Sequence, residues 1–151
     1  MEKRGKSGVI LLADDDPDDI LLVRQAFANS APFFDLRCVH DGNELIDYLF
    51  HRGRYVEKHM APRPGLILLD LNMPRKDGRL ALKEIKFHPE LRRIPVVILT
   101  TSKEKQDIMT SYDIGANSYI TKPASFESLA DTIILLKKYW FEICELPDQS
   151  R

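Results

Sequence analysis

The 151-residue sequence lacks several features that mark secreted, membrane-bound or nucleic-acid-binding proteins. It has only two cysteines, Cys38 and Cys144, far apart and outside any metal-spaced cluster, so we expect two reduced thiols and a cytoplasmic protein. It has no excess of positive charge, with 22 lysines and arginines against 23 aspartates and glutamates, which argues against nucleic acid or an anionic membrane as a partner. The apolar run over residues 9–13 is too short for a signal peptide or a membrane span.

What the sequence does contain is typical of one globular domain, with 44% hydrophobic and 30% charged residues. Short apolar runs alternate with segments of helical periodicity. We predict strands within residues 9–13, 33–42, 65–70, 94–102 and 117–120, and helices from residue 17 and over 43–51, 80–87, 103–114 and 125–144. Residues 52–64 read as an irregular connection. This alternation predicts an α/β fold, a doubly wound parallel sheet with helices on both faces.

The stretch "LLADDDPDDILLV" crowds five aspartates into the six residues from 14 to 19, between two apolar runs. Asp16 before Pro17 is typical of a helix N-cap. Asp18 and Asp19 fall in the first helical turn, where the helix dipole stabilises acids. Capping and dipole effects therefore account for three of the five aspartates and leave Asp14 and Asp15, the first two, without a structural reason.

Polar side chains also follow three other predicted strands at their carboxyl ends. Asp70 follows the third strand, Thr100 ends the fourth and Lys122 follows the fifth. Ligands of open α/β sheets bind outside the carboxyl ends of the strands. We therefore expect these groups to meet Asp14 and Asp15 in one crevice.

Such crowding of carboxylates is costly, because two unit charges about 5 Å apart repel by about 3 kcal/mol at an effective dielectric constant near 20. A hard divalent cation such as Mg²⁺ would relieve the repulsion among Asp14, Asp15 and Asp70, and Lys122 would add a second cation. A carboxylate flanked in this way can attack phosphorus and form an aspartyl phosphate.

Four motifs, "LLADDDPDD", "LILLDLNMPRKDG", "PVVILTTS" and "GANSYITKP", occur in order at the predicted strand ends. Together they resemble the response-regulator receiver domain of two-component signalling. The resemblance implies a flavodoxin-like (βα)5 fold with strand order 2-1-3-4-5. We expect a receiver domain over residues 8–144, an N-terminal extension over 1–7 and a tail over 145–151.

The resemblance also implies a role for each matching residue. Asp70 matches the phosphoacceptor, and Thr100 and Lys122 match its partners in phosphoryl transfer. The implied metal ligands are Asp14, Asp15, Asp70 and the backbone carbonyl of Asn72. Thr100 and Tyr119 match the pair whose side chains change conformation on phosphorylation.

The resemblance further implies a sensor histidine kinase as the partner. The long 52–64 connection and the lack of an output domain look like the small regulators that partner cyanobacterial phytochrome kinases. We expect signalling through protein contacts, and no enzymatic activity beyond the protein's own phosphoryl transfer and dephosphorylation.

Two other functions fit parts of the pattern. A Mg²⁺-dependent phosphatase with an aspartyl-phosphate intermediate would carry a second catalytic aspartate at position 72, where this sequence has Asn72. A flavodoxin-like FMN-binding protein would need a phosphate-binding loop after the first strand, where the acidic stretch would repel phosphate. Taken singly, each motif is also explained by a helix cap, a strand end or a surface lysine, and only their joint occurrence argues for a site.

The last predicted helix has more apolar residues than one core-facing stripe requires. Helical spacing assigns that stripe to Phe126, Leu129, Ile133, Leu136, Trp140 and Ile143. The apolar residues that this stripe leaves over, Ile134, Leu135, Tyr139 and Phe141, suggest a homodimer interface. Ile108 and Tyr112 of the preceding predicted helix and Tyr119 of the last predicted strand would extend it, so we expect an interface of Ile108, Tyr112, Tyr119, Leu135, Tyr139 and Phe141. The alternative is that the helix simply buries more than one stripe.

Overall fold

The computed structural model describes residues 8–30 and 34–147, so the expected extension over 1–7 and the end of the expected tail lie outside the described residues. Five parallel strands form one sheet in the order 2-1-3-4-5. The strands are β1 (Val9–Ala13), β2 (Asp35–Val39), β3 (Leu66–Leu69), β4 (Val96–Thr100) and β5 (Ser118–Thr121). The predicted fold class and strand order are confirmed.

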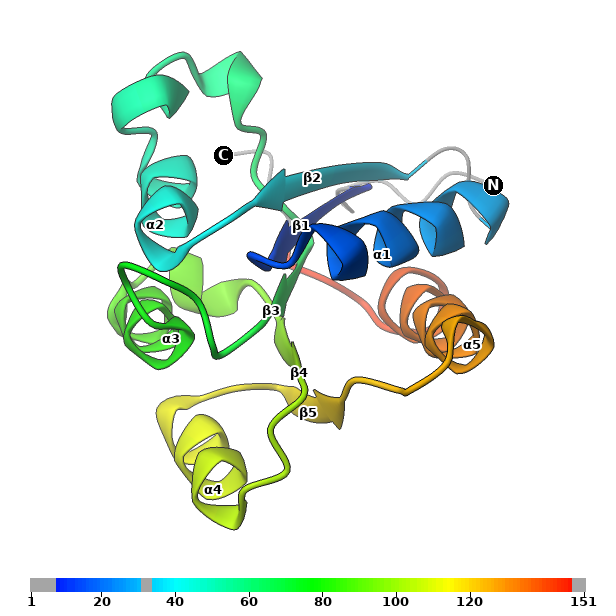
Figure 1. Cartoon of the computed structure of the whole chain (residues 1–151). Helices are drawn as coiled ribbons and strands as arrows, with labels where there is room; N and C mark the ends of the chain where they lie inside the picture. The colour runs from blue at the N-terminus through cyan, green and yellow to red at the C-terminus, as the bar shows by residue number, and fades with distance from the viewer. Residues whose placement is uncertain (1–7, 31–33, 148–151) are drawn as a thin grey trace.

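Helices cover both faces of the sheet (Figure 1). One face carries α1 (Pro17–Ser30) and α5 (Phe126–Lys137), and the other carries α2 (Gly42–Phe50), α3 (Gly78–Phe87) and α4 (Lys105–Ile114). Each face has its own cluster of buried apolar side chains. Every residue of β3 and β4 is buried, which explains why these strands are continuous apolar runs. Within the described residues, no helix is both long and apolar enough to span a membrane.

The register of the sheet brings the polar strand ends together. Ala13 of β1 lies beside Leu69 of β3, so the next residues, Asp14 and Asp70, emerge at the same edge. Gly78 keeps this edge compact, because a Cβ atom there would overlap the backbone carbonyl oxygen of Asp70. The first turn of α3 can therefore lie directly against the end of β3.

The connection over residues 52–64 contains two short 3-10 turns and folds back over α2. The Tyr48 hydroxyl donates to the Pro62 carbonyl oxygen (2.7 Å), and the Tyr55 hydroxyl donates to Glu44 Oε2 (2.6 Å). These two tyrosine hydroxyls thus attach residues 52–64, which the sequence predicts only as an irregular connection, to α2.

The final helix differs from the prediction. Its α-helical part ends at Lys137 and continues as a π-helical turn over Lys138–Ile143, closed by a hydrogen bond from the Cys144 N–H to the Tyr139 carbonyl oxygen, five residues back. The wider turn rotates Phe141 inward, where it is 6% exposed and packs edge-on against Phe34, and rotates Ile143 outward to 63% exposure. The prediction that Phe141 belongs to an exposed interface is therefore wrong.

Candidate functional site

The carboxyl edge of the sheet carries a compact polar cluster built from four strand ends. Lys122 Nζ donates to Asp14 Oδ2 at 2.7 Å and to Asp70 Oδ2 at 2.9 Å. The buried Thr100 hydroxyl donates to Asp70 Oδ1 at 2.7 Å. Asp14 and Asp70 are both buried, so water cannot screen these contacts fully. The structure thus brings the predicted phosphoacceptor together with its predicted lysine and hydroxyl partners.

The predicted metal ligands also converge. Carboxylate oxygens of Asp14, Asp15 and Asp70 lie within 4.8 Å of one another, with Asp15 exposed and the other two buried. The Asn72 N–H donates to Asp70 Oδ1 at 3.1 Å, which places its backbone beside the cluster. Three carboxylates at this spacing are the hard oxygen donors that a small divalent cation requires. The role of the Asn72 carbonyl oxygen as a ligand stays a prediction.

The electrostatics of the cluster reflect an excess of negative charge. Burial, the largest influence, and the nearby Asp70 carboxylate together raise the pKa of Asp14, although the Lys122 ammonium and the Asp16 N–H lower it. Burial alone would lower the pKa of Lys122, but its hydrogen bonds to carboxylates raise it well above its usual value. The single ammonium of Lys122 therefore does not compensate all the carboxylates at this edge of the sheet.

The acidic stretch at the start of α1 is only partly explained by the sequence. Asp16 acts as the predicted cap, since its Oδ1 accepts the Asp18 N–H at 2.9 Å. Asp19 was predicted only to complement the helix dipole, but its Oδ2 lies 2.6 Å from Lys122 Nζ. The sequence carries no clear signal for this ion pair, because it depends on how α1 is rotated above the sheet.

The two predicted switch residues point in different directions. The hydroxyl of Thr100 faces Asp70, as described above, whereas the half-buried Tyr119 donates its hydroxyl to the Ser102 carbonyl oxygen at 2.9 Å. Ser102 Oγ in turn donates to Asp107 Oδ2 at 2.6 Å, and Arg79 Nε donates to Asp107 Oδ1 at 3.0 Å. Tyr119 is therefore tied to the loop after β4 and, through it, to α4 and α3.

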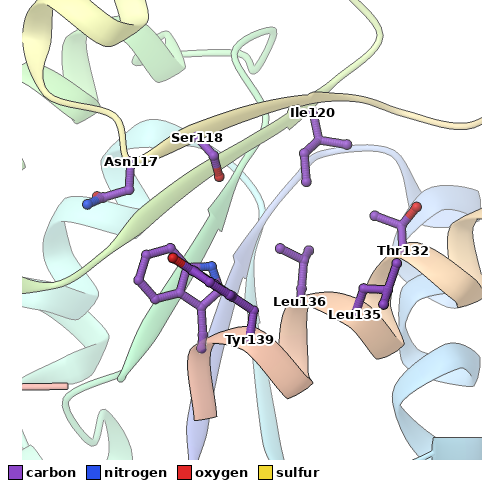
Figure 2. A pocket seen from close by; sticks show the side chains of 8 residues that line it. Asn117, Ser118, Ile120, Thr132, Leu135, Leu136 and Tyr139 are labelled. Carbon is purple, nitrogen blue, oxygen red and sulfur yellow. The ribbon is translucent and has the colours of Figure 1, made fainter. Parts of the chain in front are cut away.

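The predicted interface residues differ in their exposure to solvent. Tyr112, Leu135 and Tyr139 are exposed, Ile108 and Tyr119 are half-buried, and Phe141 is buried. A groove of about 510 Å³ runs between β5 and the end of α5. Figure 2 shows Leu135 and Tyr139 on one side of this groove and Ile120 on the other.

A five-stranded parallel sheet of order 2-1-3-4-5, with acidic, hydroxyl and lysine side chains converging at its carboxyl edge, is the architecture of a signal receiver domain. Comparison with known families agrees. The family described as the response regulator receiver domain matches residues 10–134, so the chain belongs to this family.

Individual relatives cover nearly the whole chain. Response regulator Rcp1 from Synechocystis sp. is 41% identical over 139 residues, which make up 92% of each chain. The crystal structure of the Mn²⁺-bound form of Rcp1 superposes on this chain with a TM-score of 0.83. The match covers 92% of this chain and 98% of the Rcp1 chain. The phosphorylated cyanobacterial phytochrome response regulator RcpA is 44% identical, with a TM-score of 0.87 and coverage of 93% and 99%. The predicted resemblance to regulators associated with phytochromes is confirmed.

Proposed function

We propose that this receiver domain accepts a phosphoryl group on Asp70 from a sensor histidine kinase and signals through protein contacts. The observation that carries the proposal is the convergence on Asp70 of the Lys122 ammonium, the Thr100 hydroxyl and two further carboxylates. The phosphorylated form of the relative RcpA supports the same chemistry.

In the proposed reaction, a carboxylate oxygen of Asp70 attacks the phosphorus of a phosphohistidine. A P–O bond forms, the P–N bond breaks, and its electron pair goes to the imidazole nitrogen of the kinase. Lys122 then donates to a phosphoryl oxygen, since its ammonium already lies beside Asp70. Thr100 turns its hydroxyl from the Asp70 carboxylate toward the phosphoryl group, which releases a constraint on the loop after β4.

We further propose that Mg²⁺ is held by Asp14, Asp15, Asp70 and the Asn72 carbonyl oxygen. The three carboxylates fit a divalent cation, and the relative Rcp1 has a Mn²⁺-bound form. A bound cation neutralises negative charge on the transferred phosphoryl oxygens. The choice of Mg²⁺ rests on the preference of that ion for carboxylate sites that leave positions open to phosphate oxygens.

The proposed activity is limited to the protein's own phosphorylation and dephosphorylation in the cytoplasm. Asn72 stands where a phosphatase of the aspartyl-phosphate type would carry its second catalytic aspartate. We therefore expect no turnover of p-nitrophenyl phosphate with Mg²⁺. The similarity to phytochrome regulators makes a phytochrome-type kinase the first partner to test.

The test of Asp70 is labelling by a small phosphodonor with Mg²⁺. The Asp70→Asn variant should show no acid-labile and alkali-labile acyl phosphate beyond background, whereas the variant Asp18→Asn, which changes an exposed aspartate of α1, should label like the parent. Equal labelling of the Asp70→Asn variant would move the acceptor to another residue.

We also propose that the protein forms a homodimer through α4, β5 and α5. Leu135 is 66% exposed and lines the apolar groove together with Tyr139, so a second copy could cover both side chains. Light scattering should show a dimer that Leu135→Glu dissociates, whereas Leu80→Glu, an exposed leucine of α3, should leave it intact. A monomeric parent, or a dimer that survives Leu135→Glu, would exclude this interface.

A further inference from the structure

Lys122 contacts a third carboxylate, and this one lies outside the predicted phosphoacceptor and metal set. Its Nζ lies 2.6 Å from Asp19 Oδ2, compared with 2.7 Å from Asp14 and 2.9 Å from Asp70. An ammonium group has three N–H donors, and here each faces a different carboxylate. The lysine is therefore fully engaged before any phosphoryl group arrives, and Asp19 supplies its shortest contact.

The three carboxylates differ in their surroundings. The side chains of Asp14 and Asp70 are 1% and 8% exposed, whereas that of Asp19 is 28% exposed. Asp19 lies in the first turn of α1, and Lys122 lies in the connection between β5 and α5. Their side chains line a small cleft of about 90 Å³ beside Pro123. The ion pair thus bridges two separate elements at the rim of the site.

Metal binding separates the roles of these carboxylates. Asp14 and Asp70 belong to the three-carboxylate cluster that can hold a divalent cation, and Asp19 does not. A cation bound to Asp14 and Asp70 competes with Lys122 for the charge of the same two carboxylates and repels its ammonium. Asp19 is then the one carboxylate of the three that remains available to Lys122 alone.

We propose that Asp19 is a positioning residue, which holds the Lys122 ammonium beside Asp70 when the metal occupies the other two carboxylates. This inference rests on the proposed phosphorylation of Asp70. Asp19 itself touches no reacting atom, and it acts by keeping the lysine where a phosphoryl oxygen on Asp70 needs a donor.

The test compares the maximal rate of Asp70 labelling, at saturating Mg²⁺ and phosphodonor, in four proteins. Asp19→Asn should lower this rate about tenfold, a modest part of what misplacing a catalytic group can cost. Asp19→Glu keeps the carboxylate and should restore most of the rate. Asp18→Asn removes the same charge one residue away, on the exposed side of the turn, and should label at the parental rate.

A second comparison separates positioning from a general effect of charge. The Mg²⁺ concentration for half-maximal labelling should change equally in Asp19→Asn and Asp18→Asn, because both remove one negative charge near the site. In a Lys122→Met background assayed with Mg²⁺, Asp19→Asn should cause no further loss, because its effect passes through the lysine.

The outcomes distinguish this inference from the proposed function. If the parent protein labels on Asp70 but Asp19→Asn and Asp18→Asn give the same rate, Asp19 has no positioning role. An additive loss in the Lys122→Met background would also overturn it. If the parent protein does not label at all, the proposed function fails first, and this inference fails with it.

Discussion

Two polar clusters lie at the carboxyl edge of the same sheet, and each surrounds one basic side chain. The acidic cluster places Asp14, Asp19 and Asp70 around Lys122, with Asp15 beside them. The arginine cluster, at the start of α3 and α4, consists of Arg79, Asp77 and Asp107, with Ser102 bonded to Asp107.

The clusters differ in charge balance and in burial. Four carboxylates and one ammonium give the acidic cluster a formal charge of −3, whereas two carboxylates and one guanidinium give the arginine cluster −1. The ammonium of the acidic cluster belongs to a side chain only 10% exposed, compared with 30% for Arg79. Buried charge that is left uncompensated has no structural benefit, so the acidic cluster is the one that needs a ligand. In the arginine cluster, Arg79 compensates most of the charge of Asp77 and Asp107, and its ion pair with Asp107 links α3 to α4.

The largest expected effect comes from removing the basic group of the acidic cluster. Lys122→Met leaves three carboxylates facing one another and should lower the free energy of unfolding by about 3–5 kcal/mol without metal. Adding Mg²⁺ should recover much of this loss, because the ion binds only the folded protein. Denaturant unfolding with and without Mg²⁺ measures both effects, with the exposed Lys138→Met as the control. Equal unfolding midpoints for the two variants would show that the carboxylates left without Lys122 do not destabilise the folded protein.

A smaller effect of opposite sign should follow from removing one of the acids. Burial raises the pKa of Asp14 above 3.8, so the folded protein binds more protons than the unfolded chain just above that pH. The free energy of unfolding therefore falls as the pH rises through this window. Asp14→Asn removes this contribution and should raise the stability of the metal-free protein at pH 7 by about 1 kcal/mol.

The same substitution should weaken Mg²⁺ binding, as measured by calorimetry, because it removes a charged ligand. The fall in stability with rising pH that Asp14 contributes just above pH 3.8 should be absent from the Asp14→Asn variant. A variant that is less stable than the parent at pH 7 would mean that the Lys122 contact outweighs the burial of the carboxylate.

The smallest effect is expected in the arginine cluster. Asp107→Asn weakens the contacts to Arg79 and Ser102 and should cost about 1 kcal/mol or less, since these side chains are partly exposed. The Ser102 hydroxyl and Arg79 lower the pKa of Asp107, so its contribution is present above its unfolded pKa and is lost as the pH falls. Mg²⁺ affinity should not change. A marked loss of Mg²⁺ binding in this variant would contradict the assignment of metal binding to the acidic cluster alone.

Much of the acidic cluster could be predicted from the sequence, because parallel strands end at one edge and the motifs stand directly after those strands. Asp14, Asp70, Thr100 and Lys122 were predicted to meet for this reason, and the register of the sheet brings them together. Asp19 could not be found in this way, since its contact depends on the rotation of α1 above the strand ends.

The end of the final helix could not be predicted either. A regular 3.6-residue period places Trp140 and Ile143 toward the core. Trp140 is half-buried against the core, but the π-helical turn leaves Ile143 exposed and buries Phe141 instead. Nothing in the local sequence distinguishes this turn from an ordinary α-helix. The packing of Phe141 on Phe34, a residue far away in sequence, accompanies the change.

The most direct test of the central claim is to map the phosphorylated residue. The parent protein is treated with a small phosphodonor and Mg²⁺, reduced with borohydride to convert the acyl phosphate to an alcohol, digested and analysed by mass spectrometry. The account predicts that the modification falls on Asp70 alone and requires Mg²⁺. Modification of Asp14, Asp15 or Asp19 instead, or the same yield with Mg²⁺ removed by a chelator, would contradict it.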